Sequence, residues 1–219
     1  MSYAFLFDLD GTLIDSRRSI ADACNHALTR AGRPSLPQET IAGFVGDGAR
    51  TLIARASGLG AEHTAEIDAM LAEFVRYYAA HPIDGTTWMP GARETLDALA
   101  GTPIGLVTNK ARAVTEPILD ALGVRALFGA VVAGGDGPMK PDAAPILAAM
   151  RTLGATAAGT WVVGDAVQDI RAGKAAGCRT AAVLGGFQAE ARLRADTPDL
   201  VLGSLAELRA ATAGWRPPA

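Results

Sequence analysis

Apolar and polar residues alternate in blocks along most of the 219-residue chain. Short continuous apolar runs are typical of strands buried on both faces of a parallel sheet, and they occur at residues 3–10, 103–107, 130–133, 160–163, 179–184 and 199–202. Amphipathic stretches with a helical period lie between them, near residues 91–100, 111–122, 142–153, 167–176 and 204–213. This alternation predicts an α/β fold, a Rossmann-like doubly wound parallel sheet with helices on both faces.

The segment from residue 16 to residue 84 breaks this alternation. Its apolar positions follow a helical period in three stretches separated by glycine and proline, at residues 17–31, 38–57 and 62–80. No stretch within it has a convincing strand pattern. We therefore predict a small all-helical cap domain inserted after the first strand, with the following bounds: cap 16–84, and α/β core 1–15 and 85–219.

Composition narrows the class of protein. Apolar residues make up 49% of the chain, which is typical of a globular protein. The net charge of −3 is small and gives no sign of a nucleic-acid or anionic-membrane partner. Cys24 and Cys178 are far apart and lack metal-ligand spacing, which favours two free thiols. With no signal-peptide pattern and no long apolar run, we expect a cytoplasmic protein, either a monomer or a homodimer.

Two carboxylates stand at the end of the first strand. Asp8 and Asp10 are two residues apart, so they start on the same side of the strand, and Gly11 permits a sharp turn after them. Carboxylates this close repel each other unless a cation or a shared proton intervenes. Hard oxygen ligands favour magnesium. A polar strand end with a glycine turn is the plainer alternative at this point.

Other strand ends carry polar groups as well. Thr108 and Asn109 follow the strand at 103–107, Lys140 follows the one at 130–133, and Asp165 and Asp169 follow the one at 160–163. Each has a plain explanation alone: a helix cap, a surface lysine, or acids in a first helical turn. Ligands of open α/β sheets bind beyond the carboxyl ends of the strands. The combined placement there favours one shared site.

These groups suit the hydrolysis of a phosphate ester. A carboxylate such as Asp8 can attack phosphorus and form an aspartyl-phosphate, and magnesium shared with Asp165 would offset the repulsion between the two anions. The Thr108 hydroxyl and the Lys140 ammonium could hold the phosphoryl oxygens. Asp10 could protonate the leaving alcohol and later deprotonate the attacking water.

The chain resembles the haloacid dehalogenase superfamily of aspartate-nucleophile phosphatases. The resemblance covers the whole chain and rests on four motifs: Asp8-Leu9-Asp10-Gly11-Thr12, Val107-Thr108-Asn109, Lys140-Pro141-Asp142 and Gly164-Asp165-Ala166-Val167-Gln168-Asp169. It implies the following roles. Asp8 is the nucleophile and a magnesium ligand. Asp10 is the acid and base, and binds magnesium through its backbone carbonyl. Thr108 and Lys140 hold the phosphoryl group. Asp165 binds the metal directly, and Asp169 supports the metal site through water or from behind the direct ligands.

Several stretches look most like the phosphoglycolate phosphatase group of that superfamily, among them residues 43–49, 107–110, 134–136 and 140–145. The resemblance implies a small anionic phosphate ester such as 2-phosphoglycolate as substrate. Besides the catalytic groups, we expect Thr12, Asn109, Gly46 and Arg50 to contact it. Arg50 is the candidate for pairing with a substrate carboxylate, because a guanidinium binds carboxylates in bidentate fashion. Its alternative is an exposed position on a helix.

Other functions stay open at this stage. The same core serves sugar-phosphate phosphatases and mutases, nucleotidases and pyrophosphatases. A phosphonatase needs a cap lysine, and residues 16–84 contain none. From a different class, the chain could be a non-catalytic phosphate-binding module, although a binder would not need both Asp8 and Asp10.

Overall fold

The fold is described from a computed structural model, in which residues 3–213 are described; the outermost residues of the predicted core domain, 1–2 and 214–219, lie outside that range. A six-stranded sheet has the order β5-β4-β1-β6-β7-β8, and every neighbouring pair is parallel. Its strands are β1 (Ala4–Phe7), β4 (Ile104–Ala111), β5 (Ala130–Gly134), β6 (Thr160–Gly164), β7 (Arg179–Val183) and β8 (Leu200–Leu202). The order turns back at the central strand β1, which is the topology of a doubly wound sheet.

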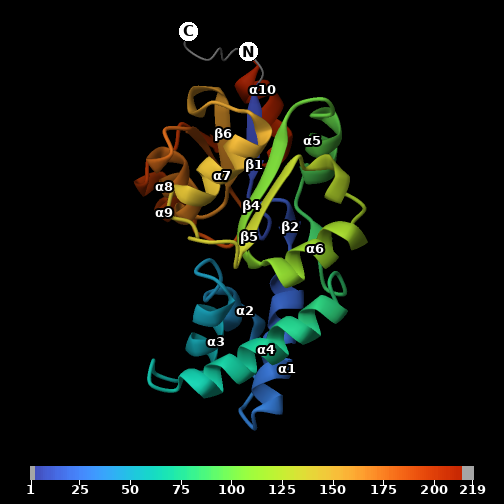
Figure 1. Cartoon of the computed structure of the whole chain (residues 1–219), viewed down its shortest axis with the longest axis vertical. Helices are drawn as coiled ribbons and strands as arrows, with labels where there is room; N and C mark the ends of the chain where they lie inside the picture. Colours follow the sequence, from blue (N-terminus) through green and yellow to red (C-terminus); the bar gives the residue numbers. More distant parts are fainter. Residues whose placement is uncertain (1–2, 214–219) are drawn as a thin grey trace.

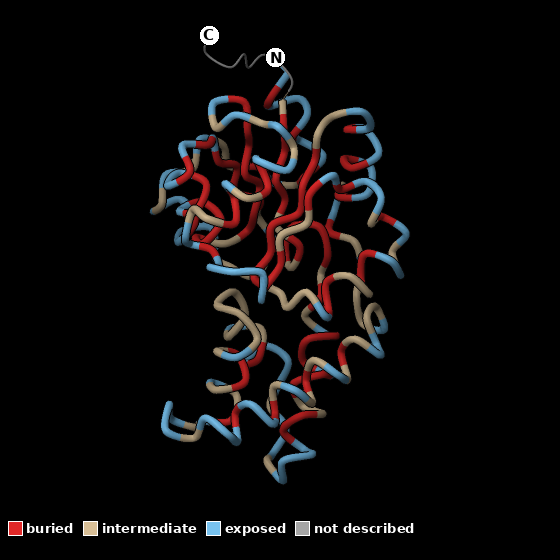
Figure 2. Tube along the Cα trace, viewed as in Figure 1, coloured by how far each residue is buried: buried red, intermediate tan, exposed pale blue. Residues whose placement is uncertain are grey.

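Helices cover both faces of this sheet. They are α5 (Ala92–Ala98), α6 (Arg112–Ala121), α7 (Ala144–Leu153), α8 (Val167–Ala175), α9 (Glu190–Ala195) and α10 (Leu208–Thr212). Side chains alternate along β1, so Phe5 and Phe7 pack in one apolar cluster with α6, whereas Leu6 packs in another with α7. Figure 2 shows the strands as the most deeply buried part of the chain. The predicted fold class is confirmed; among the α-helices described on this sheet, only α9 was not predicted.

Four further helices form a layer beyond the carboxyl ends of the strands, in the lower half of Figure 1. They are α1 (Arg17–Arg30), α2 (Gln38–Ala42), α3 (Ala49–Ser57) and α4 (Thr64–Ala80). The single helix predicted for 38–57 is wrong, because a loop at 43–48 separates α2 from α3. Gly46 and Gly48 in that loop have φ angles of 124° and 85°, which an α-helix does not allow.

The two segments that link this helical layer to the sheet pair with each other. β2 (Ile14–Asp15) and β3 (Thr87–Trp88) form a short antiparallel ribbon that the sequence pattern did not indicate. Ser19 and Thr86 share a hydrogen bond of 2.9 Å beside it. The predicted domain boundaries, at 15/16 and 84/85, fall next to this ribbon and stay a prediction. Across residues 3–213, we find no helix with the length and apolar character needed to cross a bilayer.

Candidate active site

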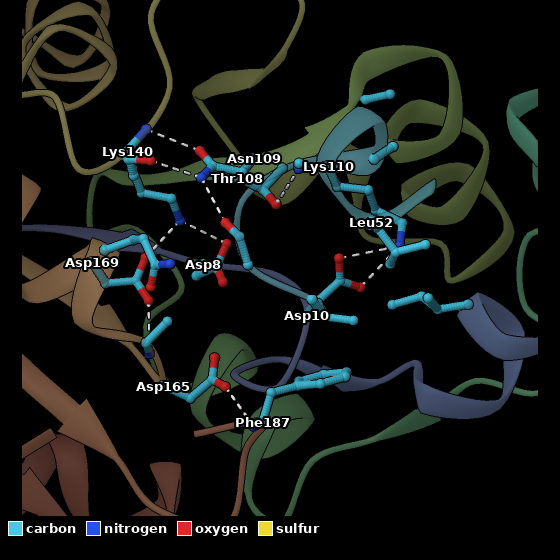
Figure 3. A pocket seen from close by; sticks show the side chains of 18 of the residues that line it. Asp8, Asp10, Leu52, Thr108, Asn109, Lys110, Lys140, Asp165, Asp169 and Phe187 are labelled. Atoms are coloured by element: carbon cyan, nitrogen blue, oxygen red, sulfur yellow. Dashed lines mark hydrogen bonds and ion pairs between the residues drawn. The ribbon is translucent and has the colours of Figure 1, made fainter. Parts of the chain in front are cut away.

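Chain segments that are distant in sequence meet between the sheet and the helical layer. They line a cavity with about 720 Å³ of empty space, part of it open to solvent. Its sheet side carries the polar groups shown in Figure 3: Asp8, Asp10, Thr108, Asn109, Lys110, Lys140, Asp165 and Asp169. The structure therefore brings the polar groups at the strand ends together in one cavity, as the sequence predicts.

Three carboxylates gather at one end of this cavity. Asp8, Asp165 and Asp169 each offer an oxygen atom, and these oxygens all lie within 4.8 Å of one another. The register of β1 against β6, with Phe7 opposite Val163, explains the approach of Asp8 to Asp165. Asp169 joins them from the first turn of α8. The side chain of Asp10 is not part of this cluster.

Glycines make room for these carboxylates. Gly11 has a φ of 83°, and a Cβ atom there would overlap the Asp165 carboxylate. A Cβ atom on Gly164 would overlap the Asp169 side chain in the same way. Any larger residue at either position would displace an acidic group, so the cluster depends on glycine at both.

Hydrogen bonds fix the orientation of the acids. Thr12 donates its hydroxyl to Asp165 Oδ1 at 2.8 Å, and the Phe187 N–H donates to Asp165 Oδ2 at 2.7 Å. The Ala166 N–H donates to Asp169 Oδ2 at 3.0 Å. Thr12, expected to contact substrate, is fully buried and does not line the cavity. Its hydroxyl orients an acid of the cluster.

Lys140 faces the acidic cluster from the loop after β5. Its Nζ atom donates to Asp8 Oδ1 at 2.8 Å, to Asp169 Oδ1 at 2.6 Å and to the Val107 carbonyl at 2.6 Å. Burial opposes its charge, but Asp169 and Asp8 outweigh burial and raise the pKa of Lys140. Thr108 lies beside it in the cavity wall, and its hydroxyl oxygen accepts the Lys110 N–H at 3.2 Å.

The acidic cluster fits a divalent cation. Burial, partly offset by Lys140, raises the pKa of Asp8 to about 6. Burial together with the charges of Asp8 and Asp169 raises the pKa of Asp165 to about 8. Three buried carboxylates facing one ammonium group are short of positive charge, and their ligand atoms are all oxygen. Mg²⁺ prefers such ligands. Asp8, Asp165 and Asp169 are therefore the residues that would hold it.

These pKa shifts predict how stability depends on pH without metal. Asp8 and Asp165 bind protons more tightly in the folded protein than in the unfolded chain, so the free energy of unfolding falls as pH rises from about 4 to about 8. We expect the melting temperature in chelator to be several degrees lower at about pH 8 than at about pH 5.5, since about 1 kcal/mol shifts it by roughly 2–4 °C at this size.

Differential scanning calorimetry at the two pH values is the measurement. Saturating Mg²⁺ should shrink the difference, because a bound cation favours the ionised carboxylates. The Asp165→Asn variant, which has no titrating group there, should shrink it as well. A chelated wild-type protein equally stable at both pH values would contradict the assigned shifts.

The side-chain amide of Asn109 is hydrogen-bonded to the protein backbone. Its Nδ2 atom donates to the Gly46 carbonyl at 2.9 Å and to the Lys140 carbonyl at 2.8 Å, and its Oδ1 atom accepts the Lys140 N–H at 2.9 Å. It lines the cavity but has used both donors of its amide, so it ties the helical layer to the Lys140 loop. Gly46 lines the cavity, and its contact with substrate stays a prediction.

Arg50 is not brought to the cavity. Its guanidinium pairs with Asp68 of α4, and both side chains are about half exposed. Ala49 and Leu52 of α3 line the cavity, whereas Arg50 does not. A helix turns by about 100° per residue, which rotates Arg50 off the face shared by Ala49 and Leu52. The sequence located the correct loop but not the facing side chains.

The helical layer contributes an apolar wall instead. Its side chains in the cavity include Ile20, Val45, Leu52 and Phe74. Across the cavity, Phe187 and Gln188 of the loop after β7 complete the lining. The sequence pattern does not assign these residues to the site, because the apolar periods of α1, α3 and α4 indicate that side chains are buried but not what they cover.

The comparisons with known proteins agree with this geometry. A model of the haloacid dehalogenase-like hydrolase family matches residues 5–183, which is most of the chain. The chain therefore belongs to this family of enzymes, and the family predicted from the four motifs is confirmed.

Comparisons with individual proteins point to one group of enzymes within this family. The chain is 38% identical to the phosphoglycolate phosphatase of Chromobacterium violaceum, covering 94% of each chain. It is 37% identical to that of Yersinia pestis, covering 92% of this chain and 89% of the other. A crystal structure of a predicted phosphoglycolate phosphatase from Haemophilus somnus superimposes with a TM-score of 0.88 at 28% identity, covering 96% and 98%. The predicted likeness to phosphoglycolate phosphatases is confirmed.

Proposed function

We propose that the chain is a Mg²⁺-dependent phosphomonoester hydrolase that works through a phosphoryl group carried on Asp8. The observation that supports this most is the Asp8, Asp165 and Asp169 cluster, with the Lys140 ammonium 2.8 Å from Asp8. A carboxylate at the open side of such a cluster is placed to attack phosphorus, and a neighbouring ammonium offsets the negative charge of the phosphoryl oxygens.

The first step transfers the phosphoryl group to the protein. A carboxylate oxygen of Asp8 bonds to phosphorus while the bond from phosphorus to the substrate alcohol breaks. Asp10 gives a proton to the leaving oxygen, and Lys140 and the Thr108 hydroxyl hold the phosphoryl oxygens. Mg²⁺ bound by Asp8, Asp165 and Asp169 would supply positive charge against the phosphoryl group.

The second step releases phosphate. The Asp10 carboxylate takes a proton from a water molecule, whose oxygen bonds to phosphorus as the bond to Asp8 breaks. Asp8 returns as a carboxylate, and Asp10 is again protonated for the next turnover.

For the substrate, we propose 2-phosphoglycolate or a similarly small phosphate ester. The proposal is supported by the named activity of the relatives at 37–38% identity. Mg²⁺-supplemented assays should give a kcat/KM for 2-phosphoglycolate at least about tenfold above those for hexose phosphates and nucleoside monophosphates. A nucleotide or hexose phosphate as the best substrate would contradict the proposal.

Replacement of Asp10 should trap the phosphorylated protein. Asp10→Asn cannot deprotonate water, and general acid–base help is worth about 10²–10⁴-fold, so breakdown of the aspartyl-phosphate should slow by about that factor. Rapid acid quench with ³²P-labelled acetyl phosphate or a labelled aryl phosphate measures the covalent fraction. Wild-type protein should show little label and Asp10→Asn much more. If no label can be trapped on either protein, direct attack by water is the better mechanism.

A further inference from the structure

The Asp10 carboxylate is held apart from the acidic cluster. Ser16 donates its hydroxyl to Asp10 Oδ1 at 2.5 Å, and Lys110 Nζ lies 3.0 Å and 3.1 Å from the two carboxylate oxygens. Figure 3 shows the carboxylate turned toward Lys110. The charge-assisted contact of Lys110 with both oxygens, together with the Ser16 hydroxyl, holds the direction of the Asp10 carboxylate.

Lys110 is itself tightly held. Its side chain is only 7% exposed, and its Nζ atom donates to the Tyr78 hydroxyl at 2.9 Å. The same Nζ lies 4.1 Å from the centre of the Tyr78 ring, within the range of a cation–π contact. Tyr78 belongs to α4 and is 1% exposed. The ammonium of Lys110 therefore joins a strand end of the sheet, the helical layer and Asp10.

Lys110 and Lys140 have separate partners. Lys140 contacts Asp8 and Asp169, whereas the acceptors of Lys110 are Asp10 and Tyr78. Two ammonium groups thus serve two different carboxylates of one cavity. A buried ammonium costs several kcal/mol of desolvation, so a surface role for Lys110 is excluded and a specific partner is required.

We propose that Lys110 is a positioning residue, which holds the Asp10 carboxylate in the direction needed to accept a proton from the hydrolytic water, and that Tyr78 of α4 holds Lys110. This role rests on the proposed function, because it concerns the second step of that reaction. It also ties the helical layer to the chemistry, since α4 supplies the group against which the lysine is fixed. The competing role is that Lys110 contacts a carboxylate of the substrate.

The two roles affect different kinetic constants. The kcat/KM of an aryl phosphate reports events up to formation of the aspartyl-phosphate, and a good leaving group needs no proton there. Hydrolysis of the aspartyl-phosphate is common to all substrates and enters kcat alone. A positioning defect in the second step therefore lowers kcat to one shared value, whereas loss of a substrate contact lowers kcat/KM for substrates that carry the contacted group.

The experiment compares wild-type protein with Lys110→Met, which keeps the aliphatic stem, in saturating Mg²⁺. The substrates are p-nitrophenyl phosphate and 4-carboxyphenyl phosphate, which carry a nitro group and a carboxylate, respectively, at the same position of the ring. For Lys110→Met we expect kcat to fall roughly 10–100-fold, to the same value for both substrates. This loss is smaller than the full effect of removing the base, because the variant keeps Asp10 and changes only how it is held. The kcat/KM of each substrate should stay within about threefold of wild type, and acid quench should show a larger covalent fraction.

A second variant tests the role of Tyr78, and a control variant tests the general effect of replacing a lysine by methionine. Tyr78→Phe keeps the ring under Lys110 and removes one hydrogen bond, so it should raise the covalent fraction in the same direction, with kcat down roughly 2–10-fold. Lys174→Met, at an exposed lysine of α8 that contacts Thr197 and the Asp196 carbonyl, should match wild type. Calorimetric Mg²⁺ titration and melting curves check that both site variants remain folded.

The outcomes separate the hypotheses. If wild-type protein hydrolyses neither aryl phosphate, the proposed function fails and the role of Lys110 fails with it. If wild-type protein is active but Lys110→Met shows an unchanged covalent fraction, only the positioning role is overturned. A kcat/KM loss confined to 4-carboxyphenyl phosphate would overturn it in favour of a substrate contact. No effect in Tyr78→Phe would remove Tyr78 from the proposal.

Discussion

We expect Asp8→Asn to lose essentially all turnover of phosphate esters while it keeps its fold. An amide is a very poor nucleophile toward phosphorus, and loss of a covalent nucleophile costs many orders of magnitude, roughly 10⁴-fold or more in well-studied enzymes. The substitution is nearly isosteric, and it removes one of three clustered negative charges, so the metal-free protein should not be destabilised by repulsion. Steady-state assays with saturating Mg²⁺ measure the loss, and circular dichroism measures the fold.

A matched control uses the same chemical change away from the cavity. Asp97 of α5 is 53% exposed and pairs with Arg93 one turn away, far from the cavity lining, so Asp97→Asn should keep wild-type activity. Acid-quenched Asp8→Asn protein should also carry no phosphoryl label, whereas Asp97→Asn should carry as much as wild type. Residual activity of Asp8→Asn above about a tenth of wild type would remove Asp8 as nucleophile.

The groups at the strand ends could be predicted from sequence because two regular rules place them. Side chains alternate along a strand, and parallel strands end at the same edge of the sheet. Asp8 and Asp165 each follow a buried apolar run, so their meeting needs only the correct strand order. Lys140 is placed by the same rules, because it comes one loop after a strand of the same sheet. In the structure Asp8, Asp165 and Lys140 lie together.

The partners of individual side chains could not be predicted in this way. Thr12 and Asn109 are at the site, but their hydrogen-bonding groups are used on Asp165 and on backbone carbonyls. Lys110 follows a predicted strand, yet its contact with Tyr78 joins two residues 32 positions apart across the cavity. Such pairs depend on how the helical layer docks, which no local period encodes.

The contacts of the loop at 43–48 are also not predictable from the sequence pattern. Its glycines allow a tight loop, although the helical period of the apolar positions runs across it, and neither pattern indicates what the loop contacts. In the structure the loop is fastened to the sheet side at two points, where Asn109 donates to the Gly46 carbonyl and Gln168 donates to Asp47 at 2.7 Å. Gln168 lies between Asp165 and Asp169 in the chain, so the short segment that leads into α8 carries two of the three acids of the cluster and a contact to the helical layer.

Removal of magnesium should abolish activity as completely as loss of Asp8. Without a cation, Asp8, Asp165 and Asp169 face the approaching phosphoryl group with only Lys140 to offset their charge. Excess chelator should therefore reduce turnover to background, and added Mg²⁺ should restore it. Asp165→Asn should require a much higher Mg²⁺ concentration for half-maximal activity, and direct calorimetric titration should show the same loss of affinity. Full activity in chelator would contradict the metal role of the cluster.

Calcium distinguishes a positioned cation from a merely neutralising one. Ca²⁺ carries the same charge as Mg²⁺, but it takes 6–8 ligands at about 2.3–2.6 Å, whereas Mg²⁺ demands octahedral geometry at about 2.0–2.1 Å. If the cluster needed only charge, Ca²⁺ would support turnover. Because the proposed mechanism uses Asp8 as both ligand and nucleophile, a longer and looser shell should misdirect its free oxygen, so Ca²⁺ should bind, compete with Mg²⁺ and inhibit. Equal rates with the two cations would show that alignment of Asp8 does not depend on the metal.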